Sequence, residues 1–169
     1  MERGLIPVGS AGDVEELWPM LTRSRPDVVL LDYHLPRADG LALCRQIKAR
    51  LLAPKVRLYS AYAGSEMSIP ATLAGADGVI GKAIPARELY DAIRRVAGGD
   101  LVLPPVSPEL MREASERVDA EDLPILGMLL HRTPVPDIAP ALNLDAAAVD
   151  QRIDAMIGRL RVEVPAFEP

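Results

Sequence analysis

The sequence predicts an α/β protein: a doubly wound parallel sheet with helices on both faces, followed by a small all-α domain. Along residues 1–105, short β-like runs alternate with segments of helical period, which is the pattern of repeated βα units. One run, Val28–Leu31, places four apolar residues between Pro26 and Asp32, as in a strand buried on both faces of a parallel sheet. After residue 105 the composition becomes polar and acidic, and the later segments have helical period.

The chain opens with a short β-like segment, Leu5–Ala11, followed by a helix over residues 14–23. Asp13 is of the residue type that caps helix N-termini, and two glutamates follow in the first turn, where the helix dipole favours negative charge. Pro19 would weaken the middle of this helix, because proline lacks the N–H that an interior position donates.

Three more helices and two more strands are expected after Asp32. Pro54 ends the first of these helices and Pro70 interrupts the second, whereas Gly98 and Gly99 end the last. In chain order the segments are a helix at 40–52, a strand at 55–60, a short or irregular helix at 64–74, a turn and short strand within 75–82 that ends in a lysine, and a helix at 85–96.

Composition excludes several classes of protein. The single cysteine, Cys44, excludes an internal disulfide and suits a reducing compartment. No apolar run approaches the roughly 20 residues that span a bilayer, and the first residues lack the layout of a signal peptide. We therefore expect a soluble cytoplasmic protein with no membrane partner. No glycine-rich phosphate cradle, metal cluster or catalytic triad is present in the sequence, which argues against an enzyme.

Three polar residues end three predicted strands. Because the carboxyl ends of parallel strands meet at one rim of a sheet, Asp32, Ser60 and Lys82 should lie close together. A carboxylate can accept a phosphoryl group, a hydroxyl can hydrogen-bond its oxygens, and a lysine can pair with the added charge. The combination predicts a phosphoryl-accepting site.

Residues 5–105 resemble the receiver domain of two-component response regulators, from RPDVVLLDYHLPRADG through LYSA to GADGVIGKAIPARELYDAIRRVAGGDLVLPP. The last stretch is particularly similar to the NarL/FixJ subfamily. The resemblance implies a flavodoxin-like fold in which Asp32 is the phosphoacceptor, Ser60 and Lys82 support the phosphoryl group, and the backbone carbonyl of His34 binds Mg²⁺. It also implies a sensor histidine kinase as partner.

Relative to that family, this receiver lacks its first strand and helix, and with them the acidic pair that completes the Mg²⁺ site. Asp32 and one carbonyl make an incomplete site, because Mg²⁺ needs several well-placed oxygen ligands. Val79 stands where the family usually has an aromatic residue that rotates on activation.

The missing strand would lie in the middle of the family's sheet, between the Val8 segment and the Asp32 strand. Three solutions remain open: the gene begins upstream of Met1, the first strand moves over to pair with the Asp32 strand, or another chain fills the gap. Because an open strand edge invites another chain, we expect a homodimer, or a heterodimer with another regulator.

Residues 118–163 resemble the LuxR-type helix-turn-helix of the same subfamily, with residues 106–117 as a linker. Asn143–Asp145 would form a turn and N-cap, and the third helix would turn an apolar face inward. The resemblance implies DNA binding by the outward residues of that helix, and the candidates are Gln151, Arg152 and Arg159.

Charge argues for weak DNA binding, since affinity for duplex DNA comes largely from lysine and arginine against phosphates. Residues 101–169 contain six arginines and no lysine, against twelve aspartates and glutamates. The two positions where the family usually has contact lysines are Asp150 and Asp154. Two functions therefore compete: an atypical response regulator that controls transcription, and a phosphorylation-independent interaction module that has lost DNA binding and pairs with another regulator.

Overall fold

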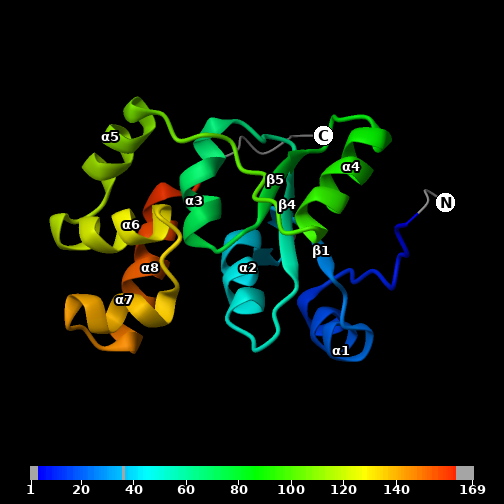
Figure 1. The fold of residues 1–169 in the computed structure, drawn as a ribbon, viewed down its shortest axis with the longest axis horizontal. Helices are drawn as coiled ribbons and strands as arrows, with labels where there is room; N and C mark the ends of the chain where they lie inside the picture. The colour runs from blue at the N-terminus through cyan, green and yellow to red at the C-terminus, as the bar shows by residue number, and fades with distance from the viewer. Residues whose placement is uncertain (1–3, 36, 163–169) are drawn as a thin grey trace. The chain divides into compact units, whose positions relative to one another are not determined.

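The computed structural model describes residues 4–35 and 37–162, which group into two compact units (Figure 1). The first unit comprises the residues up to 63 together with 75–103, and the second comprises residues 64–74 together with those from 104 onward. Among the described residues, no helix is both long enough and apolar enough to cross a membrane.

Three parallel strands form the sheet of the first unit, in the order β1-β4-β5. They are β1 at Val28–Asp32, β4 at Lys55–Ser60 and β5 at Gly78–Gly81. Leu58 of β4 lies beside Leu31 of β1 on one side and beside Val79 of β5 on the other. A separate antiparallel pair consists of β2 at His34–Leu35 and β3 at Ala38–Asp39. The predicted parallel βα architecture is confirmed.

The described helices of the first unit are α1 at Val14–Ser24, α2 at Gly40–Lys48 and α4 at Ala86–Ala97. Helices α2 and α4 lie on opposite faces of the sheet. Helix α2 contacts β4, in which Val56 and Leu58 are fully buried. On the opposite face, Arg57 donates a hydrogen bond of 3.2 Å from Nη1 to the carbonyl oxygen of Ala92 in α4.

Helix α1 begins where the sequence predicts. The Asp13 carboxylate accepts a hydrogen bond of 2.9 Å from the backbone N–H of Glu16, and the helix runs through Pro19 to Ser24. It ends at Arg25, whose φ of 43° lies in the left-handed region. The proline is therefore accommodated without breaking the helix.

The prediction of a first strand at residues 5–11 is wrong. Residues 5–11 lie outside any helix or strand, and Ile6 is 83% exposed and Val8 51% exposed. A strand needs a neighbour to satisfy its backbone, and within the described chain β1 pairs only with β4. For the same reason β1 is an edge strand of the described sheet. The prediction that it is buried on both faces is also wrong, because its central residue Leu30 is 39% exposed.

Burial shifts the pKa of Cys44 and of Arg57 in the first unit. Cys44 is fully buried, and burial raises the pKa of its thiol to about 12, so the thiol stays protonated at neutral pH. Arg57 is 2% exposed; burial, assisted by the charge of Arg95, lowers the pKa of its guanidinium to about 10. A Cβ at position 78 would lie 3.1 Å from Arg57 Nη1, and the glycine there leaves room for the guanidinium.

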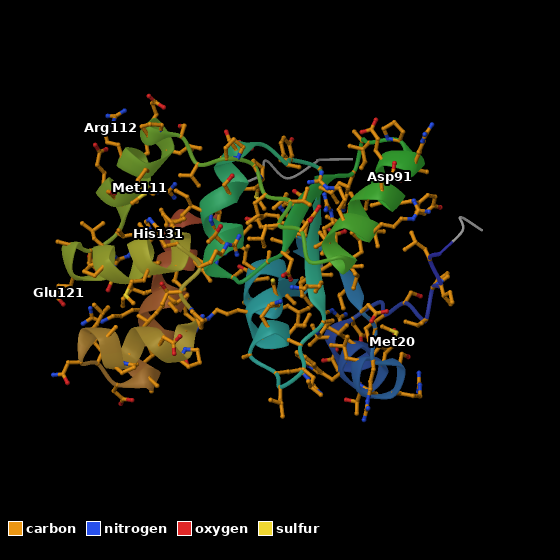
Figure 2. All side chains as sticks on the ribbon, viewed as in Figure 1. Met20, Asp91, Met111, Arg112, Glu121 and His131 are labelled. Carbon is orange, nitrogen blue, oxygen red and sulfur yellow. The ribbon has the colours of Figure 1, made fainter. Side chains whose placement is uncertain are left out.

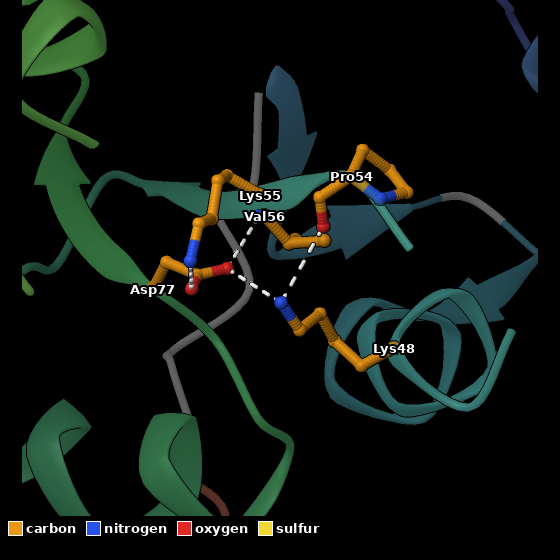
Figure 3. Close-up of polar contacts among 5 residues, drawn as sticks. All are labelled: Lys48, Pro54, Lys55, Val56 and Asp77. Carbon is orange, nitrogen blue, oxygen red and sulfur yellow. Dashed lines mark hydrogen bonds and ion pairs between the residues drawn. The ribbon is translucent and has the colours of Figure 1, made fainter. Parts of the chain in front are cut away.

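The buried carboxylate of Asp77 ties β4 to the chain that leads into β5 (Figure 3). Asp77 Oδ2 accepts hydrogen bonds from the backbone N–H of Val56 at 2.8 Å and from Lys48 Nζ at 2.9 Å, and Oδ1 accepts one from Lys55 Nζ at 3.3 Å. Lys48 Nζ also donates to the carbonyl oxygen of Pro54 at 3.4 Å. One side chain thereby fixes the start of β4 against the end of α2 and the start of β5.

The second unit is helical. Its elements are the 3₁₀ turn η1 at Ser65–Met67, α3 at Ser68–Leu73, α5 at Pro108–Arg117, the 3₁₀ turn η2 at Ala120–Asp122, α6 at Leu123–Leu130, α7 at Val135–Leu142 and α8 at Ala146–Leu160. Helix α3 contacts both α6 and α8. Ile125, Leu126 and Ile153 are among its fully buried side chains. Part of the stretch expected as a linker is thus the helix α5.

The turn between α7 and α8 has the predicted chemistry. Asn143 adopts a left-handed φ of 53°, and the backbone N–H of Leu144 donates to the carbonyl oxygen of Ala139 at 2.8 Å, which closes α7. The Asp145 carboxylate accepts from the N–H of Ala147 at 3.1 Å and caps α8. The apolar face of α8 is buried, and Val149 and Ile157 lie on it.

Candidate functional site

Asp32 and Lys82 meet at the rim of the sheet. Asp32 ends β1, and Lys82 follows β5, two strands away. Lys82 Nζ lies 2.5 Å from Asp32 Oδ2, while the backbone N–H of His34 donates to Oδ1 at 3.0 Å. The side chains of Asp32 and Lys82 are 34% and 37% exposed, so a small phosphodonor in solution can reach the carboxylate.

Ser60 lies at the end of the strand between them, but its side chain faces inward. It is fully buried, and its Oγ accepts a hydrogen bond of 3.1 Å from the backbone N–H of Tyr62. The backbone N–H of Lys82 donates to the carbonyl oxygen of Ser60 at 2.8 Å, which holds the two strand ends together. The structure thus brings Asp32 and Lys82 into contact, whereas the buried Ser60 hydroxyl bonds to the backbone of Tyr62.

The aromatic ring of Tyr59 helps to place the lysine. Lys82 Nζ lies 5.6 Å from the centre of the ring, a distance at which a cation is attracted to the ring face. Tyr59 pairs in register with Asp32 on one side and Ile80 on the other. Nothing near Tyr59 in the sequence indicates that Lys82 would lie over its ring.

Gly40 is a site residue that sequence reasoning missed. A Cβ at this position would lie 2.6 Å from the carbonyl oxygens of both Asp32 and Tyr33, closer than side chains approach backbone. The neighbouring Asp39 caps α2 by accepting from the N–H of Leu41 at 2.8 Å. The chain can therefore return to Asp32 and start α2 at once only with glycine at position 40; the Asp-Gly pair after the apolar strand was the available signal.

The donor set at the rim does not fit a Mg²⁺ site on its own. Both Asp32 oxygens already accept hydrogen bonds, and the described residues contain no group of three or more His, Cys, Asp or Glu side chains placed to hold a metal. Mg²⁺ prefers octahedral oxygen coordination, and one carboxylate supplies little of it.

On the outward side of α8, the three predicted DNA-contacting residues differ in their surroundings. Gln151 is exposed. Arg152 is bound inside the unit: its Nη1 lies 3.2 Å from Asp122 Oδ1, and its Nη2 lies 3.4 Å from Glu121 Oε2; Figure 2 shows Glu121 at the surface. Arg159 Nη1 lies 2.7 Å from Asp119 Oδ2.

These ion pairs give both arginines a second role. The Asp122 side chain is only 7% exposed, so Arg152 supplies the charge that a nearly buried carboxylate needs. Asp119, Glu121 and Asp122 all belong to the short segment before α6, and the two arginines therefore fasten α8 to it. Asp150 and Asp154 are exposed on the same helix, as the sequence predicts.

Comparisons with known proteins bear on both sites. The family model for the response regulator receiver domain matches residues 1–94. The DNA-binding transcriptional activator DevR/DosR of Mycobacterium tuberculosis is 31% identical over 166 residues, covering 92% of this chain and 76% of that protein. The nitrate/nitrite response regulator NarL of Escherichia coli is 24% identical, covering 92% of this chain and 77% of its own length.

A solved structure of the Salmonella typhimurium RcsB response regulator shares the fold. It aligns with a TM-score of 0.51 at 18% identity, covering 93% of this chain and 79% of that one. At this level of identity the similarity concerns the fold alone. This chain therefore spans about three quarters of the length of these relatives.

Gly40→Ala should destabilise the protein by roughly 1–3 kcal/mol, because the new methyl group meets backbone that cannot move without shifting the rim. Gly158→Ala in α8 is the matched control: its Cβ meets nothing within 4 Å, so it should stabilise by up to about 1 kcal/mol. Urea unfolding followed by circular dichroism measures both. A Gly40→Ala protein as stable as the wild type would show that the turn at Asp32 is not tightly constrained.

Arg152→Ala should cost roughly 1–3 kcal/mol of stability, because Asp122 would lose its charged partner while staying nearly buried. Gln151→Ala, one residue away and exposed, should change stability by less than about 0.5 kcal/mol. The same unfolding measurement compares them. Equal and negligible effects would mean that the arginine does not support α8.

Proposed function

This chain belongs to the response regulators of two-component systems, in the NarL/FixJ subfamily with its LuxR-type helix-turn-helix, and we propose that it regulates transcription as an atypical member. We assign residues 1–105 to the receiver-like domain, 106–117 to the linker and 118–163 to the helix-turn-helix domain. The proposed partners are a sensor histidine kinase, DNA, and a second copy of the chain or another regulator. The proposed place of action is the cytoplasm.

The phosphoacceptor in this proposal is Asp32, and the observation that carries it is the contact with Lys82 across the rim. In the transfer, a carboxylate oxygen of Asp32 forms a bond to phosphorus as the bond from phosphorus to the donor's leaving group breaks, and the leaving group keeps the electron pair. Lys82 then pairs with the phosphoryl oxygens. Ser60 could support the product only after releasing the N–H of Tyr62.

Receiver domains generally bind Mg²⁺ at this place. In this chain the ligands would be Asp32 and the backbone carbonyl of His34, a set that is incomplete without further oxygens. We therefore propose that Asp32 accepts phosphate inefficiently, and that the protein acts largely without it.

The chain should react poorly with acetyl phosphate in the presence of Mg²⁺, because few protein groups offset the charge of the transferring phosphoryl group. Intact-mass spectrometry after incubation measures the modified fraction, and Asp32→Asn provides the unmodifiable control. Stoichiometric modification that disappears in Asp32→Asn would overturn the proposal of inefficient phosphorylation and leave Asp32 as the acceptor.

For the helical unit we propose weak DNA binding through α8. Gln151 and, to the extent that they leave their carboxylate partners, Arg152 and Arg159 are the groups available for contact. The exposed carboxylates of Asp150 and Asp154 on the same helix oppose approach to phosphates. The alternative, an interaction module without DNA binding, is less favoured by the family membership.

The double change Asp150→Lys and Asp154→Lys should raise affinity for random duplex DNA and steepen its dependence on salt by roughly two units of logarithmic slope, one for each new phosphate contact. Fluorescence anisotropy at several salt concentrations measures both. The matched control is Glu109→Lys with Glu113→Lys, which has the same spacing and charge change on the exposed side of α5. If both pairs of lysines act equally, α8 is not the element that meets DNA.

A further inference from the structure

An apolar pair of side chains stands in solvent at the loop between α2 and β4. Leu51 and Leu52 are 94% and 92% exposed, more than any other large hydrophobic side chain in the described part of the chain. Figure 1 shows the segment that joins α2 to β4 as a loop extending past the end of the helix. Single exposed leucines are common, but two adjacent ones that contact almost nothing in their own chain are available to another molecule.

The backbone at Leu52 is strained. Its φ of 59° lies in the left-handed region, which residues with a Cβ rarely adopt. The other described non-glycine residues of this kind, Arg25, Arg132 and Asn143, lie within two positions of a helix end, where the conformation closes the helix. Leu52 lies four residues past the end of α2. Strain that neither closes a helix nor brings a side chain into the core is typical of a segment shaped for function.

The loop is fixed at its base. Lys48 Nζ, at the end of α2, donates to the carbonyl oxygen of Pro54 at 3.4 Å, on the other side of the two leucines (Figure 3). The backbone N–H of Lys55 donates to the carbonyl oxygen of Asp27 at 2.9 Å, where β4 begins. The leucines are thus presented on an ordered support, which lowers the entropy that a partner must remove on binding.

The leucines lie in a basic part of the chain. Residues 44–57 contain five lysines and arginines and no aspartate or glutamate, and only Asp77 pairs with two of these cations, Lys48 and Lys55. Contact between the leucine pairs of two copies would bring like charges together, which is unfavourable. Residues 101–169, with six arginines against twelve aspartates and glutamates, carry the opposite charge. The complementary surface therefore belongs to the helical unit.

The helical unit has a groove of matching character. It has a volume of about 550 Å³ and is lined by residues of α8 and of the turn η2. Ala120, Ala148 and Ala155 line it with short apolar side chains that leave space for longer ones. Asp119 and Glu121 also line it, and their side chains are 64% and 82% exposed. Such a groove can accept leucines in the middle and cations at its sides.

We propose that Leu51 and Leu52 of one copy insert into this groove on the helical unit of a second copy. The contact specifies the homodimer proposed above and rests on that proposal; made reciprocally, it closes the assembly at two copies. Gln151, one of the proposed DNA-contacting residues, lines the same groove. A second copy and DNA therefore compete for this side of α8, and self-association controls DNA binding.

Two singly substituted proteins test the contact. Leu51→Cys and Ala155→Cys proteins, mixed in equal amounts under mild oxidation, should form at least tenfold more disulfide-linked heterodimer than Leu51→Cys mixed with Ala141→Cys. Ala141 is the matched control, because it is an exposed alanine on α7 of the same unit and does not line the groove. The native Cys44 is fully buried and does not compete. Cross-linking no greater than the control overturns the contact.

Leu51→Asn with Leu52→Asn removes the apolar pair without adding charge. Asparagine tolerates a left-handed φ better than leucine, so the melting temperature should not fall. Light scattering at micromolar concentration should give twice the mass of 18.2 kDa for the wild type, and the dissociation constant of the variant should be at least tenfold higher. Leu101→Asn, at a leucine that is 51% exposed elsewhere in the first unit, should leave the dimer unchanged.

The outcomes separate the two proposals. An Asn variant that dimerises as tightly as the wild type overturns this contact and leaves the homodimer proposed above, whereas a monomeric wild type overturns both.

DNA binding provides an independent readout. At protein concentrations where the wild type is a dimer, the Leu51→Asn and Leu52→Asn variant should bind random duplex DNA more tightly in fluorescence anisotropy, because its α8 is uncovered. Where both proteins are monomeric they should bind equally, since neither substituted residue belongs to the helical unit. Equal affinity at the higher concentrations as well overturns the competition for α8.

Discussion

The parallel pairing of β1, β4 and β5 is the constraint on which the rest of the first unit depends. Because all three strands run the same way, their carboxyl ends share one rim, and residues distant in sequence meet there. Asp77 contributes to this alignment from the other end, since its carboxylate binds the first residues of β4 beside the entry to β5. A shift in that pairing would separate Asp32 from Lys82.

The ion pair at the rim is close but not strong. Both side chains are about a third exposed, so solvent screens their attraction, and exposed pairs of this kind contribute at most about 1 kcal/mol. A contact of this strength suits a reactive carboxylate, because Lys82 can leave and return at little cost. The carboxylate of Asp77, by contrast, is buried and binds a backbone N–H and two lysines, so its role is structural.

Local sequence patterns predicted the structural features that depend on residues close together in the chain. The strand before Asp32, the cap at Asp13 and the turn at Asn143 follow from residue type and spacing, and the parallel order places Asp32 beside Lys82. Other features depend on contacts between distant residues. Nothing near Arg152 indicates that Asp122, thirty positions earlier, would hold it, and the β-like composition of residues 5–11 cannot reveal that no neighbouring strand is in reach.

Residues 64–74 give the two units an interleaved path. The backbone leaves the first unit after Ala63, supplies α3 to the helical unit and returns at Gly75 to form β5. Every residue of α3 is buried, and its contacts with α6 and α8 are lost if the chain is cut at residue 103. Neither unit is a continuous stretch of sequence; the helical unit needs residues from both sides of such a cut, whereas the sheet unit lies wholly before it. A fragment that ends at residue 103 would therefore contain all of the sheet unit and would also carry α3, whose buried side chains would have lost the helices that cover them.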